Sequence, residues 1–152
     1  MSAQKLTVAQ LREFLENINF NRLVGLRLVR VHPDGATLAC SLRPELMNGA
    51  GVLHGGVTAT LADVAVGMAI THQLGRPRAA TTVEMKVNYL RPVVAGQVTA
   101  RARLLRIGST LCCGRVDIRD SHRQLVATAL VTYMLLNPGR IESHKEKPDD
   151  AT

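Results

Sequence analysis

The sequence is poor in aromatic residues and in cysteine, and both shortages argue against particular kinds of site. Aromatic residues make up 3% of the 152 residues and Trp is absent, so few side chains are available to stack on single-stranded bases. The three cysteines, Cys40, Cys112 and Cys113, are odd in number and lack the C-x-x-C spacing. They therefore favour buried thiols in a reducing compartment over disulfides or a zinc site.

The start of the sequence lacks the apolar segment of a signal peptide and carries charges instead. Together with reduced thiols, this predicts a cytoplasmic location. The longest apolar run has a length of roughly 17 residues, at the lower limit for crossing a bilayer, and an aspartate interrupts it. We therefore expect no membrane span.

Basic residues are in excess, with 19 Lys and Arg against 12 Asp and Glu and a net charge of +7. Such an excess suits an anionic partner, either a nucleic acid or a phosphate-bearing small molecule. The basic residues are spread along the chain and stacking side chains are scarce. We therefore expect the small molecule as partner and no nucleic acid.

The hydrophobic pattern predicts an α+β protein with one long central helix. A helix is expected over 7–19 with Thr7 as N-cap, and a longer apolar helix over about 55–72. Alternation and turn signals predict antiparallel strands, expected at 23–31, 36–42, 83–89, 97–106, 110–119 and 124–136. A helix that is apolar on nearly every face must be covered by other elements, here by a curved sheet. The predicted units are an N-terminal helical segment (1–22), a main domain (23–137) and a polar tail (138–152).

The candidate site lies in residues 48–70, NGAGVLHGGVTATLADVAVGMAI. Burying Asp63 there is costly unless the carboxylate is paired or used, and a desolvated carboxylate is a good general base or nucleophile. The alternative is an aspartate that faces a polar pocket or caps a strand. Gly55 and Gly56 leave the helix N–H groups open to a ligand oxygen, or only permit close packing. His54 orients a ligand or, more commonly, caps the helix.

Gly55 and Asp63 are eight positions apart, which separates them by ~12 Å along one helix. One small carbonyl cannot touch both. If they serve one reaction, two helices must supply them, which predicts a two-fold dimer with antiparallel helices.

The ordered set Asn48, His54, Gly55, Gly56 and Asp63 resembles that of hotdog-fold acyl-CoA thioesterases, in the subfamily of the phenylacetate-pathway thioesterase. The similarity continues through TVEMKVNYLRP (82–92) and RIGSTL (106–111) and covers about 23–136. It implies a hotdog fold, a homodimer and commonly a homotetramer. It also implies hydrolysis of acyl-CoA to a carboxylic acid and CoA, with no metal or organic cofactor.

The resemblance assigns roles to individual residues. Asp63 would be the catalytic carboxylate, acting as nucleophile or through water, and the Gly55 N–H would polarise the thioester carbonyl. Asn48 would bind the carbonyl or the water, with His54 in support, and Thr82 falls where some relatives orient a water. Gly55 and Asn48 of one subunit would meet Asp63 and Thr82 of the other. Residues expected to contact substrate or CoA are Gly56, Tyr89, Arg91, Arg106, Gly108, Ser109 and Thr110.

One expectation conflicts with the strand pattern. Simple alternation puts Thr82 on the face of Glu84 and Lys86, opposite Val83, so a bulge or a subunit-facing surface is needed to bring Thr82 to Asp63. Two alternative functions remain open, besides a basic nucleic-acid binder, which is the third and least favoured. One is an enoyl-thioester hydratase. Hotdog hydratases typically place Asp and His five residues apart, whereas here His54 precedes Asp63 by nine residues, which disfavours this activity. The other is a non-catalytic acyl-CoA-binding module. The scarcity of aromatics favours medium-chain or aryl-acetyl groups.

Overall fold

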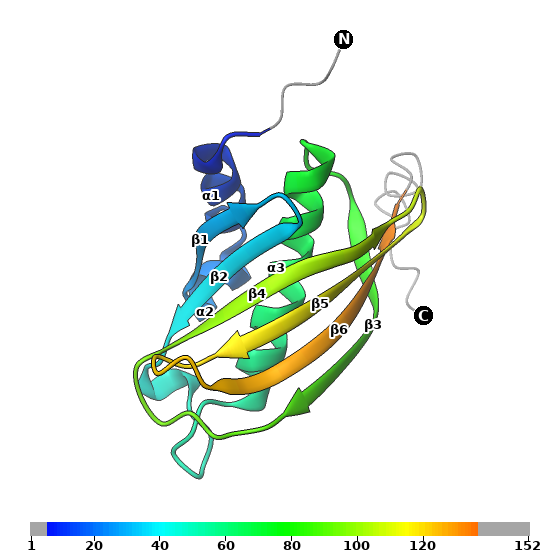
Figure 1. Ribbon diagram of the computed structural model, residues 1–152. Coiled ribbons are helices and arrows are strands. Elements are labelled where there is room, and N and C mark those ends of the chain that lie inside the picture. Colours follow the sequence, from blue (N-terminus) through cyan, green and yellow to red (C-terminus); the bar gives the residue numbers. More distant parts are fainter. Residues whose placement is uncertain (1–5, 137–152) are drawn as a thin grey trace, which may run out of the picture.

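The computed structural model describes residues 6–136, which form three helices, a short 3-10 turn (Pro44–Leu46) and six strands. The helices are α1 (Val8–Glu16), α2 (Asn19–Val24) and α3 (Gly55–Leu74). The strands are β1 (Leu26–His32), β2 (Gly35–Ser41), β3 (Ala80–Tyr89), β4 (Gln97–Ile107), β5 (Leu111–Arg119) and β6 (Leu125–Leu135). They form one antiparallel sheet in the order β1-β2-β4-β5-β6-β3, curved over the long helix (Figure 1). The predicted α+β hotdog architecture is confirmed.

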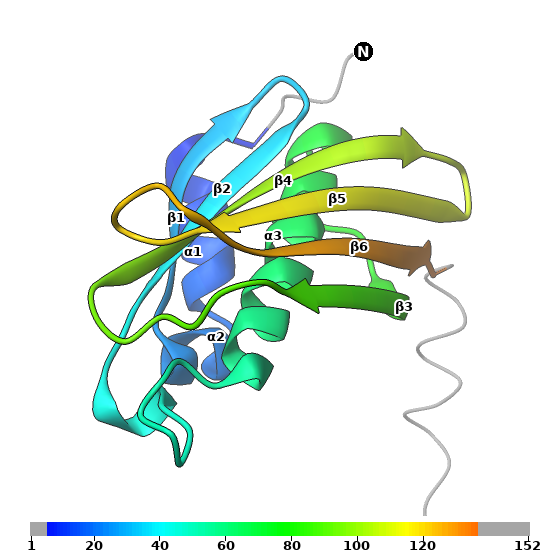
Figure 2. The same ribbon diagram turned by 60° about the horizontal axis from the view of Figure 1, so that its bottom comes forward.

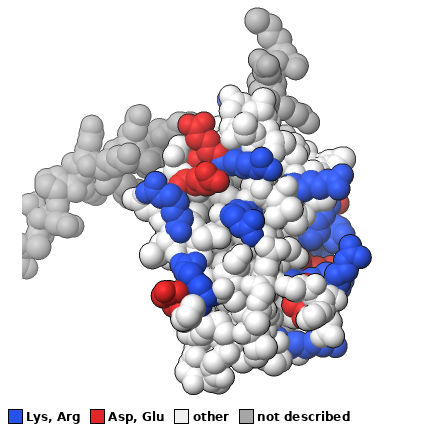
Figure 3. Space-filling view, turned by 90° about the vertical axis from the view of Figure 1, so that its left-hand side faces the viewer, with Lys and Arg blue, Asp and Glu red and all other residues white. Residues whose placement is uncertain are grey.

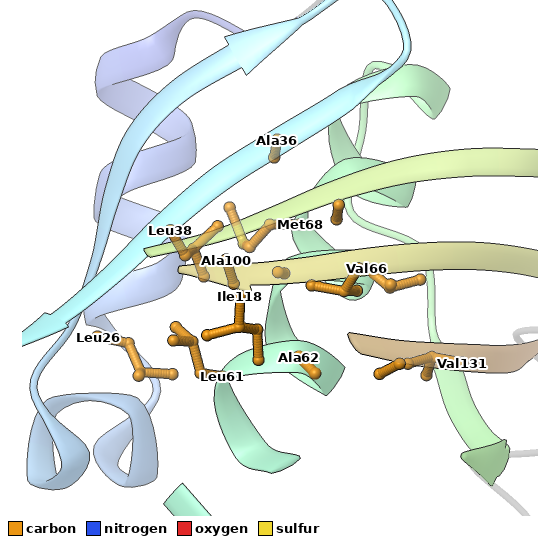
Figure 4. Close-up of a cluster of buried hydrophobic side chains, with 14 of the residues drawn as sticks. Leu26, Ala36, Leu38, Leu61, Ala62, Val66, Met68, Ala100, Ile118 and Val131 are labelled. Carbon is orange, nitrogen blue, oxygen red and sulfur yellow. The ribbon is translucent and has the colours of Figure 1, made fainter. Parts of the chain in front are cut away.

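The core lies between α3 and the inner face of the sheet. Leu61, Ala62 and Val66 of α3 are fully buried against β4, β5 and β6 (Figure 4). Figures 1 and 2 show α1 beside α3 on the same side of the sheet. The sheet curves over α3 as expected, and Val57 and Val64 on the helix pack against the core while staying only half-buried.

The N-terminal helices depart from the predicted pattern. Thr7 caps α1 as expected, in a capping box with Gln10. Residues 23–25, predicted as strand, instead end α2, with Gly25 in the left-handed region at φ +81°. A six-residue helix is too short to leave a recognisable periodicity, which explains the error. The predicted boundary at 22/23 falls within α2, and the predicted tail lies outside the described residues.

β3 is one of the two edge strands of the sheet, and the alternating apolar side chains of this strand are not fully buried. It pairs only with β6, and Val83 and Met85, the apolar residues of the alternating pattern, are 49% and 36% exposed. The register shifts between Thr82 and Glu84, which leaves Val83 as the extra residue of a bulge. Thr82 thereby pairs with Tyr133 on the inner face of the sheet. The bulge required by the sequence prediction is present.

The surface carries its charges in small mixed groups on the side shown in Figure 3, where basic side chains lie apart with acidic ones among them. No continuous basic stripe of the kind that tracks a nucleic-acid backbone is visible on that side. None of the helices within residues 6–136 is long and apolar enough to cross a membrane.

Candidate active site

The first turn of α3 forms one end of the candidate site. His54 is the N-cap, and its Nδ1 accepts a hydrogen bond of 2.9 Å from the Gly56 N–H. The capping role anticipated for His54 is therefore present, and the Gly56 N–H is already engaged. The Gly55 N–H donates to no atom of the described chain, as is usual for the first helical residue. Of the two glycine amides, Gly55 has the donor available to a ligand.

Asn48 lies beside this helix end, in the loop that precedes α3. Its Oδ1 accepts from the backbone N–H groups of Ala50 and Val52, at 2.9 and 3.3 Å. This turn fixes the side-chain amide and leaves its NH₂ group as the remaining donor. Asn48 and Gly55 line the same cavity of about 370 Å³.

Two residues expected at the CoA site lie in the same cavity. Tyr89, at the end of β3, donates from its hydroxyl to the Gly55 carbonyl at 3.0 Å. Arg91 donates to the Leu125 carbonyl at 2.7 Å and remains exposed. The end of β3 and the start of α3 are thus tied together by a direct hydrogen bond.

Asp63 lies two turns further along α3, at the other end of β3. The Thr82 hydroxyl donates to Asp63 Oδ1 at 2.8 Å, which the β3 bulge makes possible. The carboxylate is half-buried and faces the edge strand, so the prediction that it is buried among apolar neighbours is wrong. Helical spacing explains this, because Leu61 and Ala62 point into the core while Asp63 turns away from it.

Tyr133 is a residue of this site that the sequence prediction missed. Its hydroxyl donates to the Asp63 backbone carbonyl at 3.0 Å, and burial raises its pKa well above the usual tyrosine value. It is therefore a permanent donor that ties β6 to α3. In the sequence, only the position of Tyr133 among apolar residues of a predicted strand could have indicated a buried hydroxyl in need of a hydrogen-bond partner.

Residues 108–110 form the turn between β4 and β5, and Arg106 lies near the end of β4. Arg106, Gly108, Ser109 and Thr110 line one cavity of about 440 Å³, as the resemblance grouped them. The Gly108 N–H, however, donates to the Leu111 carbonyl at 2.8 Å, so it closes the turn and is not free for a ligand. Cys113 and Thr132 also line this cavity, on the opposite face of the sheet from Tyr133.

The structure therefore places the predicted residues in three separate groups, one of which is the set Arg106, Gly108, Ser109 and Thr110 at the turn between β4 and β5. Asn48, Gly55 and Tyr89 lie at one end of β3, and Asp63 with Thr82 at the other. The eight-residue interval along α3 still separates Gly55 from Asp63 by ~12 Å. Within one chain, a single carbonyl cannot contact both.

Two of the three cysteines do not offer a second reactive group. Cys40 and Cys112 are buried, and burial raises the pKa of both thiols, which disfavours the thiolate. In the part of the chain that the structure describes, no three His, Cys, Asp or Glu side chains are grouped to hold a metal ion.

Comparison with known proteins identifies the family of this chain. The model of the family described as "Thioesterase superfamily" matches residues 50–127. The medium/long-chain acyl-CoA thioesterase YigI of Salmonella typhimurium is 32% identical over 137 residues, covering 80% of this chain and 88% of YigI.

Solved structures show the same fold. A thioesterase from Haemophilus influenzae superposes with a TM-score of 0.81 at 25% identity, covering 89% of this chain and 94% of that one. The Escherichia coli PaaI protein of the phenylacetic acid degradation operon superposes with a TM-score of 0.75 at 21% identity, covering 86% and 97%. From the family match, the YigI similarity and the shared fold, we conclude that this chain belongs to the thioesterase superfamily and is a thioesterase with a PaaI-like hotdog fold.

Proposed function

We propose that the protein hydrolyses acyl-CoA thioesters to a carboxylic acid and free CoA. The observation that carries the proposal is the Asp63 carboxylate, half-buried on α3 and held at 2.8 Å by the Thr82 hydroxyl. A carboxylate fixed in this way is suited to attack an activated acyl group or to activate a water. The acyl-CoA substrate is supported by the activity for which the YigI relative is named.

The chemistry needs a donor for the thioester oxygen as well as a carboxylate. The Gly55 N–H and the Asn48 side-chain NH₂ group supply two donors beside one cavity. Negative charge that develops on the carbonyl oxygen is stabilised by such fixed donors. In one route Asp63 takes a proton from a water that adds to the carbonyl carbon, and the C–S bond then breaks and the CoA sulfur takes up that proton. In the other route the Asp63 carboxylate itself adds to the carbonyl carbon, the C–S bond breaks with release of CoA, and a water then hydrolyses the acyl–Asp63 anhydride to the carboxylic acid and the free carboxylate.

The Gly55 and Asn48 donors and the Asp63 carboxylate can act on one thioester carbonyl if two subunits share each site. β3 is an unpaired edge, and Thr82 near its start touches Asp63 while Tyr89 at its end touches Gly55. Two β3 edges side by side in antiparallel orientation bring the start of one strand to the end of the other. A homodimer formed in this way unites Asp63 of one subunit with Gly55 and Asn48 of its partner. This geometry supports a dimer, and further pairing gives the tetramer implied by the resemblance.

The basic excess has a use in the same proposal. Arg91 and Arg106 are exposed arginines beside the two cavities described above, and CoA carries phosphates that guanidinium groups bind well. Their place at strand ends leaves both able to reach a nucleotide on the surface. No metal or organic cofactor is needed for the reaction, and the cytoplasm, where CoA thioesters and reduced thiols coexist, remains the predicted location.

The test is thiol release from a panel of acyl-CoAs by the wild type, by Asp63→Asn and by Glu16→Gln. Asn retains the acceptor for Thr82 but is neither base nor nucleophile, so kcat is expected to fall about 10²–10⁴-fold. Glu16 is exposed on α1, and its variant is expected to match the wild type. Binding of an S-alkyl-CoA thioether should survive in all three proteins. Absence of turnover by the wild type on every acyl-CoA would contradict the proposal and favour the binding-module alternative.

A further inference from the structure

A cavity of about 200 Å³ opens beside Asp63, separate from the two cavities described above. It lies between the N-terminal helices, α3 and the ends of β3 and β6. Its walls include Phe14, Ile18, Val64, Met68 and Ala80. These residues come from four regions of the chain, so nothing in the sequence pattern groups them.

The α3 wall of this cavity begins at Val64, the residue that follows the candidate catalytic Asp63, and Tyr133 in the same wall bonds the Asp63 backbone carbonyl. Val64, Gly67, Met68 and Thr71 follow Asp63 at positions one, four, five and eight, which places all of them on one side of the helix. Thr71 lies ~12 Å beyond Asp63 along the axis. A chain attached to a carbonyl at Asp63 thus has a continuous path along this side of α3.

The neutral polar side chains in the wall are engaged by the protein itself. The Asn21 amide donates to the Leu15 carbonyl at 3.1 Å, and the Thr71 hydroxyl donates to the Gly67 carbonyl at 3.0 Å. The Tyr133 hydroxyl is bonded to the Asp63 carbonyl. Arg78 can lay its aliphatic stem along the cavity and keep its charge in water. The wall therefore behaves as apolar towards a guest.

We propose that this cavity holds the acyl chain of the thioester and that Phe14 and Ile18 set the length it accepts. The inference rests on the proposed function, because it takes the reacting carbonyl to lie at Asp63. The cavity holds about six or seven groups of water size, at ~30 Å³ each. An unbranched medium-chain acyl group fits this volume and the ~12 Å path.

Two residues control the far end of the cavity. Phe14 of α1 is half-buried in its wall, whereas Ile18 at the start of α2 is 42% exposed and lies at its rim. Phe14→Ala extends the space available to a chain. Ile18→Trp narrows it from the outside, with little risk to folding. Phe20→Ala is the matched control, because Phe20 is exposed on α2 and does not line the cavity.

The experiment measures kcat/KM for saturated acyl-CoAs from two to sixteen carbons with the wild type and these three variants. Each methylene that enters the cavity is expected to raise kcat/KM by up to about fourfold, until the cavity is full. Ile18→Trp should lower the ratio of kcat/KM for octanoyl-CoA to kcat/KM for acetyl-CoA by at least about tenfold. This corresponds to excluding two methylene groups of the acyl chain from the cavity. Phe14→Ala should move the plateau to longer chains, and Phe20→Ala should leave the profile unchanged.

Failure of this inference and failure of the proposed function are distinguishable. Hydrolysis by the wild type with the same chain-length profile in Ile18→Trp and Phe14→Ala would overturn the acyl cavity and leave the thioesterase standing. If the wild type hydrolyses nothing, calorimetric binding of S-ethyl-, S-octyl- and S-dodecyl-CoA thioethers decides. Chain-length-dependent affinity that Ile18→Trp reduces supports the cavity, and affinity indifferent to length or to that variant overturns it.

Discussion

Two side chains hold Asp63, one through its carboxylate and the other through its backbone carbonyl. Thr82 bonds the Asp63 side chain and Tyr133 bonds the Asp63 backbone, so the edge strand and the last strand both position the residue. The Tyr133 hydroxyl lies in a buried environment that disfavours its ionisation and raises its pKa. Its contribution to stability must therefore depend on pH.

Tyr133→Phe is expected to lower the free energy of unfolding by about 0.5–1.5 kcal/mol at neutral pH, because one internal hydrogen bond is lost. The pKa is raised in the folded state, so the unfolded chain releases the proton first. The stability that Tyr133 provides is present below pH ~10 and declines as the pH rises above that value. Urea titrations of both proteins between pH 7 and 11 should show the wild-type advantage shrinking above pH ~10. A constant difference would mean that the hydroxyl is hydrated in the folded state.

At the scale of elements, the distance between α3 and the sheet decides where the site residues stand. β5 passes so close to α3 at Gly114 that an added Cβ would lie 2.9 and 3.0 Å from the two γ-methyl groups of Val66. Val66 is fully buried, so it has little room to move. The absence of a side chain at Gly114 sets this close approach of helix and sheet.

Gly114→Ala is expected to destabilise the protein by about 1–3 kcal/mol, because the helix and the strand must move apart. Gly49→Ala is the matched control, since a Cβ there meets no heavy atom within 4 Å. Adding Val66→Ala to Gly114→Ala should restore part of the loss by removing the clashing methyl groups. Urea unfolding of the four proteins measures the effect, and equal stability of the two single variants would contradict it.

At the scale of the whole molecule, one chain contains two half-sites at opposite ends of β3. Asn48 and Gly55 form one of them, and Asp63 with Thr82 forms the other. Subunit exchange tests whether the two halves come from different chains. Asn48→Asp keeps the oxygen that bonds Ala50 and Val52 and removes the NH₂ donor, so the loop should persist.

Asn48→Asp and Asp63→Asn are each expected to be nearly inactive alone. When they are unfolded together in equal amounts and refolded, about a quarter of the wild-type activity should return, because half of the dimers are mixed and each mixed dimer has one intact site. Refolded wild type, carried through the same steps, gives the reference. If both halves belong to one chain, mixing restores nothing.

The sequence alone determined the features that depend on neighbouring residues. Alternation and turn residues predicted the antiparallel strands, and the apolar run after Gly55 predicted the long helix, because these patterns report local backbone geometry. The spacing of Gly55 and Asp63 also showed that one chain could not bring both to one carbonyl. The ordered motif residues then indicated the thioesterase superfamily, which the comparisons confirmed.

Only the tertiary structure decided what depends on contacts between distant segments. The contact of Thr82 with Asp63 required a bulge at Val83, whose position is set by pairing with β6. Residues 23–25 end the short helix α2 instead of beginning the predicted strand, and Asn21 of that helix reaches back to the Leu15 carbonyl, a contact that no periodicity reveals. The cavity beside Asp63 likewise forms only when α1, α3 and the sheet pack together. Packing, rather than local propensity, therefore fixed the surroundings of the carboxylate.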